Sequence, residues 1–253
     1  MIYLMFIISL LPPLLLFFFM RNRIEKDNKA HRTLCSKALL SGILSVFLVL
    51  LFSGCTALII GLTGIKASHP LLQTVLYNFI VLAGAEEAAK FLTLKRFMKK
   101  HPYPYSWMTI VICMMIIGIG FGLVEAVIYA IGADAMTMIV RGITMGHAGY
   151  GFIMGWFYGK AKKTGKSSYT WIALIFPILL HGTYDCFLSD YMKELNDNLP
   201  IISLVLAIMS IVTIIIAIRF LRKQRSNEVY MAPFSEFSPV AEEAPAAKQT
   251  ENL

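Results

Sequence analysis

Long apolar runs separated by short polar clusters make up most of the chain. A bilayer core is crossed by about 17–25 mainly apolar residues in a helix. Seven runs have this length, at about 2–20, 38–61, 73–97, 107–131, 137–159, 169–188 and 199–220. Backbone polar groups in lipid must be satisfied within helices or closed barrels, and runs this long suit helices. The pattern predicts an all-α, polytopic transmembrane bundle of about seven helices.

Composition and charge agree with a membrane protein. Apolar residues make up 57% of the chain and charged residues only 15%, whereas soluble domains carry about 25% charged residues. The net charge of +8 lies in short clusters between the apolar runs, which does not indicate a nucleic-acid partner. We therefore expect a multi-pass protein of the cell membrane, surrounded by the lipid bilayer. The four cysteines are scattered and match neither a disulfide framework nor a CxxC metal site.

The basic clusters predict the orientation of the bundle. They follow the first, third, fifth and seventh runs, as in Arg21–Lys37, Lys99–Lys100, Lys160–Lys166 and Arg222–Arg225. Because cytoplasmic loops are enriched in Lys and Arg, the N-terminus is expected outside and the C-terminus in the cytoplasm. The first run has its positive charges after the apolar stretch, so it is interpreted as a retained helix and not as a signal peptide.

Eight ionisable side chains fall inside the predicted spans. A charge at the centre of a span costs about 2.5–3.5 kcal/mol, so such residues usually have a function. A structural network of ion pairs is the alternative. The eight are Glu86, Glu87 and Lys90 in the third span, Glu125 in the fourth, Arg141 and His147 in the fifth, and His181 and Asp185 in the sixth.

The spacing of these residues predicts contacts. Glu86 and Lys90 are four residues apart, as are His181 and Asp185, and residues at this interval share a helix face. A carboxylate next to the histidine would fix the tautomer of its ring. The glutamate pair and both histidines are predicted near the centres of their spans, with Glu125, Arg141 and Asp185 toward the outer side. We expect all of them to converge on one cavity.

Small residues follow the fifth span at intervals of four. Gly151, Gly155 and Gly159 form a ridge at which two helix backbones can approach closely. We interpret these glycines as packing residues that bring the polar helices together.

Four motifs occur in order on successive spans, and together they resemble the PrsW family of intramembrane proteases. The motifs are Glu86-Glu87-Ala-Ala-Lys90, Phe121-Gly-Leu-Val-Glu125, His147-Ala-Gly-Tyr-Gly151 and His181-Gly-Thr-Tyr-Asp185. The resemblance covers about residues 75–190 and extends to a superfamily with CAAX prenyl proteases and bacteriocin-processing or immunity proteins. The CAAX-type branch usually has His where this chain has Glu125, so the role of that histidine is not carried over.

The resemblance implies an intramembrane endopeptidase that makes a site-1-type cut in a single-pass substrate, such as an anti-sigma factor. It implies that Glu86, Glu87, His147, His181 and Asp185 are catalytic, and Lys90, Glu125 and Arg141 are interpreted as supporting. Residues 1–225 would form the membrane domain, with the catalytic core at about 73–188. Residues 226–253, rich in Glu, Ala, Pro and Ser, are predicted to be a disordered cytoplasmic tail.

A glutamic-type mechanism without a cofactor is the preferred hypothesis. One glutamate would activate water as a general base while the other orients it. His147 would position the water or transfer protons, and His181, oriented by Asp185, would donate to the oxyanion. Lys90 would compensate the carboxylate charge.

Two other interpretations remain open. A zinc site could use His147, His181 and Glu125, although the chain has no HExxH motif. A non-catalytic immunity-like protein or a proton-coupled membrane protein could also carry buried carboxylates and histidines. The paired glutamates with both histidine motifs favour the protease over these.

Overall fold

The computed structural model describes residues 2–24, 27–63, 69–132, 141–195 and 199–234. Apart from one isolated bridge between Ser106 and Pro233, all regular structure in these ranges is helical, which confirms the all-α prediction. The helices are α1 (Ile2–Phe19), η1 (Met20–Ile24), α2 (Lys29–Leu44), α3 (Val46–Leu62), α5 (Pro70–Leu76), η2 (Tyr77–Leu82), α6 (Ala83–Lys100), α7 (Trp107–Gly132), α9 (Gly146–Thr164), α10 (Ser168–Leu188), α11 (Asp190–Leu195), α12 (Leu199–Lys223) and α13 (Glu228–Met231).

Several helices are long and apolar enough to cross a membrane. Within the described ranges, four reach this length and hydropathy: Lys29–Leu62, Trp107–Tyr129, Ser168–Leu188 and Leu204–Gln224. They coincide with the predicted spans 38–61, 107–131, 169–188 and 199–220, and Phe6–Asn22 is a shorter apolar helix within the first. The protein is therefore a membrane protein with multiple spanning helices. The count of seven spans and their orientation stay predictions.

The third predicted span is a continuous helical rod of three segments, α5, η2 and α6. Its π-helical part, η2, ends directly before the turn that carries Glu86 and Glu87. A π segment changes the direction of the side chains that follow it, and such segments are frequent at functional sites.

The fifth predicted span, 137–159, is not one straight helix. Residues 133–140 lie outside the described ranges. Met145 has a left-handed backbone with φ of 47°, and α9 begins after it at Gly146. A right-handed helix cannot continue through that conformation. His147 therefore lies in the first turn of α9, and its predicted place near the centre of the membrane stays a prediction.

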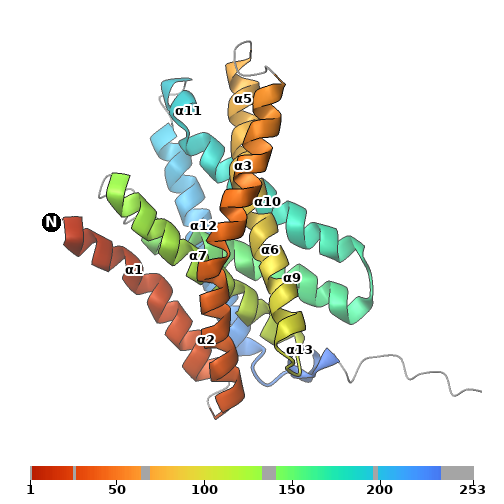
Figure 1. Ribbon diagram of the computed structural model, residues 1–253. Coiled ribbons are helices and arrows are strands. Elements are labelled where there is room, and N and C mark those ends of the chain that lie inside the picture. Colours follow the sequence, from red (N-terminus) through yellow and green to blue (C-terminus); the bar gives the residue numbers. More distant parts are fainter. Residues whose placement is uncertain (1, 25–26, 64–68, 133–140, 196–198, 235–253) are drawn as a thin grey trace, which may run out of the picture.

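Helix α7 lies at the centre of the bundle, between α2 and α9 (Figure 1). Every residue from Met108 to Ile117 is buried. A helix that is apolar on all sides is expected in such a position.

Two glycines of α9 allow this close packing. A Cβ at Gly151 would lie 2.7 Å from the Met114 carbonyl oxygen, and one at Gly155 would lie 2.8 Å from the Val111 Cα. The predicted packing role of the glycine ridge is thereby confirmed at both positions.

The first part of the predicted tail is ordered. Residues 226–234 are ordered, and Tyr230 of α13 packs its ring against Trp107, Trp156 and Phe220. These aromatic contacts hold the start of the tail against α7, α9 and α12. The prediction of disorder from residue 226 is therefore wrong over its first residues, and residues 235–253 lie outside the described ranges.

Candidate active site

All eight ionisable residues predicted from the sequence lie in one group. The first turns of α6 supply Glu86, Glu87 and Lys90. The Lys90 Nζ lies 2.8 Å from Glu87 Oε1 and 3.3 Å from Glu86 Oε2. The predicted pairing of Glu86 with Lys90 is confirmed, and Lys90 holds the second glutamate more closely. Lys90 and Glu87 are both fully buried, so their charges depend on these contacts.

The start of α9 connects this group to α7. His147 Nδ1 lies 3.0 Å from Lys90 Nζ, and its Nε2 lies 2.6 Å from Glu125 Oε2. An ammonium has no lone pair to accept a hydrogen bond, so Lys90 donates to Nδ1 and the ring donates from Nε2 to Glu125. Arg141 donates to the other oxygen of Glu125 at 3.0 Å.

Helix α10 completes the arrangement. His181 Nδ1 lies 2.8 Å from Glu87 Oε1, and its Nε2 lies 3.1 Å from Asp185 Oδ2. Asp185 Oδ1 in turn lies 4.0 Å from Arg141 Nη2. The predicted contact of Asp185 with His181 is therefore confirmed. His181 faces a carboxylate from each ring nitrogen, which suits a ring that donates from both.

These contacts form a closed circuit, which we call the polar ring. In order it contains Glu87, Lys90, His147, Glu125, Arg141, Asp185 and His181. Each acidic residue lies between two basic residues or histidines along it, and Lys90 and His147 are the one adjacent pair without a carboxylate between them. Four segments distant in sequence contribute, so the ring also ties α6, α7, α9 and α10 together.

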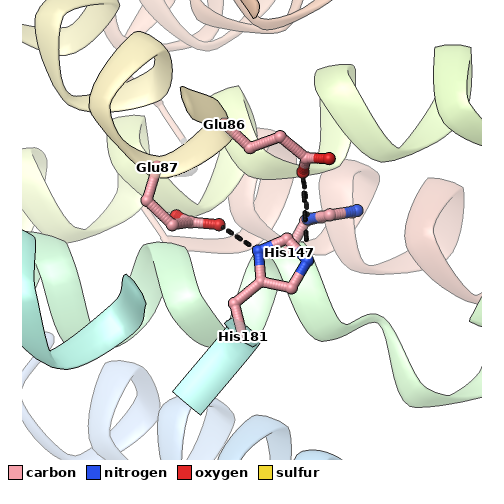
Figure 2. A group of neighbouring side chains, drawn as sticks. All are labelled: Glu86, Glu87, His147 and His181. Atoms are coloured by element: carbon pink, nitrogen blue, oxygen red, sulfur yellow. Dashed lines mark hydrogen bonds and ion pairs between the residues drawn. The ribbon is translucent and has the colours of Figure 1, made fainter. Parts of the chain in front are cut away.

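Glu86 is not one of the seven residues of the polar ring, but its carboxylate lies close to both histidines of the ring. Its Oε2 faces His147 Nδ1 at 4.0 Å and His181 Nε2 at 3.9 Å (Figure 2). Its side chain is 12% exposed, whereas that of Glu87 is 0% exposed. Figure 2 shows the Glu87 carboxylate directed at the His181 ring and the Glu86 carboxylate directed at both histidines. The two neighbouring glutamates therefore have different surroundings.

Aromatic side chains enclose the site: Phe121 and Tyr150 belong to the four motifs, whereas Tyr129 was not singled out. The Lys90 Nζ lies 4.1 Å from the centroid of the Phe121 ring, and the Arg141 guanidinium lies 4.1 Å from that of Tyr129. Both are cation–π distances. Tyr150 stacks on His181 with centroids 4.8 Å apart. Tyr150 lies one helical turn after His147, a spacing that could have indicated it.

A polar cavity of about 320 Å³ opens at the ring. We call it the histidine cavity; it is lined by Glu125, Arg141, Thr144, Gly146, His147, Tyr150, His181, Tyr184 and Ser210. A mainly apolar pocket of about 400 Å³, lined by α9, α10 and α12, adjoins it. We call this the α12 pocket, and it is lined by Gly146, Gly149, Tyr150, Ile153, Leu180, Tyr184, Leu206, Met209, Ser210 and Thr213. The two share Gly146, Tyr150, Tyr184 and Ser210, so they are adjacent spaces.

Four residues of the site are also candidate metal ligands. One donor atom from each of Glu86, Glu87, His147 and His181 lies within 4.8 Å of the others. The predicted alternative set of His147, His181 and Glu125 differs from this group, because Glu125 stands behind His147 at its Nε2.

Comparisons with known proteins agree on one family. Residues 29–218 match the family described as "PrsW family intramembrane metalloprotease". "Protease PrsW" of Shouchella clausii is 33% identical over 128 residues, which are 49% of this chain and 57% of the relative. "Protease PrsW" of Bacillus subtilis is 34% identical over 89 residues, 33% of this chain and 41% of the relative.

A more distant relative is matched over a longer stretch. "Protease PrsW" of Clostridioides difficile is 23% identical over 194 residues, 73% of this chain and 79% of the relative. The match to the Shouchella clausii relative and to two others covers between 51% and 59% of the relatives' own lengths. No solved structure matches the chain. The family match extends over more than half of the chain and includes all four motifs of the polar ring, so the protein belongs to the PrsW family.

Proposed function

We propose that this protein is an intramembrane endopeptidase that uses Glu86 as the general base. The observation that carries the proposal is the position of Glu86. Its side chain is 12% exposed, next to the fully buried Glu87 and Lys90, and its carboxylate faces both histidines. Membership of the PrsW family supports peptide hydrolysis as the reaction.

The two glutamates have different roles in this proposal. Glu87 Oε1 already accepts hydrogen bonds from Lys90 and His181. A carboxylate held in this way positions its neighbours and is a poor acceptor for a further proton. Glu86 contacts Lys90 at the longer distance of 3.3 Å and retains exposed surface for water. Glu86 is therefore the better base.

The reaction then proceeds in two proton transfers. Water attacks the scissile carbonyl carbon while its proton moves to Glu86. His181 donates from Nε2 to the oxyanion in place of Asp185, which is 3.1 Å away. When the C–N bond breaks, Glu86 returns the proton to the leaving nitrogen. His147, fixed by Lys90 and Glu125, lines the cavity beside the site.

The matched family is described as metalloproteases, and the donor atoms of this site decide whether a metal ion fits. Glu87 Oε2 is buried without a hydrogen bond, which leaves one acceptor open. However, the Lys90 ammonium lies between Glu86, Glu87 and His147. The four ring nitrogens of His147 and His181 each face a partner already. The site as arranged does not fit a metal ion, and the proposed reaction uses none.

We propose a single-pass membrane protein, such as an anti-sigma factor, as the substrate. The α12 pocket supports this, because it adjoins the histidine cavity and its lining is mainly apolar. Adjacent residues of an extended chain are about 3.3–3.4 Å apart. A peptide bond at Glu86 would therefore place side chains a few residues away in the α12 pocket.

The test is cleavage of candidate single-pass proteins co-expressed with the wild type or with Glu86→Gln. Glu86→Gln should abolish cleavage while the protein accumulates normally, because the amide cannot accept the proton. Glu194→Gln is the matched control, since this glutamate is exposed on α11. Normal cleavage by Glu86→Gln would remove Glu86 from the mechanism. If the same substrate were cleaved equally in cells that lack the protein, the proposed function would be refuted.

A further inference from the structure

We propose that the ammonium of Lys90 occupies the position of a divalent cation in this site, and that its removal turns the site into a zinc site. Lys90 Nζ contacts three of the four candidate metal ligands, namely Glu87 at 2.8 Å, His147 at 3.0 Å and Glu86 at 3.3 Å. A cation therefore already lies among these donor atoms, and it is covalently attached to the protein.

The spread of the donor atoms fits an ammonium better than a metal. Zinc binds N and O ligands at about 2.0–2.2 Å, so two of its ligands lie at most about 4.4 Å apart. The donor atoms of Glu86, Glu87, His147 and His181 span up to 4.8 Å. Hydrogen bonds from a charged nitrogen are about 2.7–2.9 Å long, close to the shorter contacts of Lys90. The lysine thus holds the donors slightly too far apart for zinc.

The surroundings of Lys90 hold its ammonium in this place. The side chain is 0% exposed, so no water competes for its hydrogen bonds. The Nζ also lies over the Phe121 ring, 4.1 Å from its centroid. Carboxylates, imidazole and aromatic ring together surround the charge. A zinc ion next to it would meet strong repulsion in this poorly solvated site.

The histidines give an independent indication. Zinc needs an imidazole nitrogen with a free lone pair. His147 Nδ1 accepts from Lys90, and His181 faces Glu87 and Asp185 with its two nitrogens. Without the ammonium, His147 Nδ1 and an oxygen of each glutamate would lose a donor at once. These three atoms, with His181, are a donor set of the kind that zinc prefers.

The inference concerns the same site as the proposed protease, but its test measures metal content and not proteolysis. Either can therefore fail without the other. Wild type, Lys90→Met and Lys90→Arg are purified in detergent from zinc-supplemented cells without chelators, and bound metal is measured by mass spectrometry. Lys90→Met should hold about one zinc ion per chain, and its thermal midpoint should rise with added zinc. Wild type and Lys90→Arg, which keep a cation, should hold none.

Two controls make the result specific. Lys99→Met removes an exposed lysine from the same helix and should not gain zinc. Lys90→Met combined with His147→Ala should lose the gained zinc. If Lys90→Met does not fold, Lys90→Gln, which keeps a neutral NH₂ donor group, takes its place. Zinc in the wild type that His147→Ala removes would overturn the proposal. It would also be overturned if neither Lys90→Met nor Lys90→Gln gained zinc or was rescued by it.

Discussion

The close approach of α9 to α7 gives a quantitative prediction, tested by comparing Gly155→Ala with Gly54→Ala. A Cβ at Gly155 would lie 2.8 Å from the Val111 Cα and 3.2 Å from the Ile110 carbonyl oxygen. These are backbone atoms of the buried half of α7 and cannot rotate away. A Cβ at Gly54, on α3, would meet nothing within 4 Å.

The comparison isolates the clash. Both substitutions gain up to about 1 kcal/mol of helix propensity, because alanine replaces glycine inside a helix. Only Gly155→Ala adds overpacking, which costs about 1–3 kcal/mol. Gly155→Ala should therefore be less stable than Gly54→Ala by about 1–3 kcal/mol, a factor of about 5 to 150 in the folding equilibrium.

The clash at Gly155 should also displace residues of the candidate active site. His147 lies eight residues before Gly155 on the same helix, about 12 Å away at 1.5 Å per residue. When α9 moves off α7, His147 moves relative to Glu125, which is 2.6 Å away. A misplacement of about 1 Å can cost about 100-fold in rate, so Gly155→Ala should also cleave the substrate more slowly.

The assay is unfolding of both variants by a graded denaturing detergent in mixed micelles, followed by circular dichroism. Gly151→Ala is a second test, because its Cβ would lie 2.7 Å from the Met114 carbonyl oxygen. Stabilities of Gly155→Ala and Gly54→Ala that agree within about 0.5 kcal/mol would refute the packing argument. The two helices would then be further apart than described.

Three further outcomes are expected. Leu206→Trp, which fills the α12 pocket, should lower cleavage of substrates with large apolar residues, whereas Leu204→Trp, 61% exposed on the same helix, should not; equal effects would exclude the pocket from substrate binding. A reporter active only outside the cell should work when fused near Asn196 and fail near Lys163, and the reverse would invert the topology. Mass spectrometry of the products should place the cut in the outer half of the substrate's span or just outside it, and a new terminus at the cytoplasmic boundary would contradict this.

Much of the site could be predicted from the sequence, because intramembrane charges are costly and therefore informative. All eight residues singled out on this ground lie in one group. The contacts within one helix, Glu86 with Lys90 and His181 with Asp185, also followed from the four-residue interval.

The contacts between helices could not be obtained in this way. The pairing of His147 with Glu125 and Lys90 depends on the rotation of α9 about its axis. That rotation follows from the left-handed backbone at Met145, which side-chain periodicity does not reveal. The π-helical turn η2 before Glu86 has the same effect on α6. The pattern of apolar residues therefore located the helices, but it did not predict the rotation of each helix about its own axis.

The two halves of α7 differ in their burial, and this difference indicates from which side water reaches the site. From Met108 to Ile117 the helix is buried against its neighbours, whereas the pockets that touch it are lined by residues from Gly118 to Tyr129. Glu125 lies on this second half, and it borders the histidine cavity together with Arg141. In the predicted orientation this half faces outward. Because hydrolysis needs water at Glu86 and the polar lining is on this side, the substrate is expected to meet its nucleophile in the outer part of the membrane.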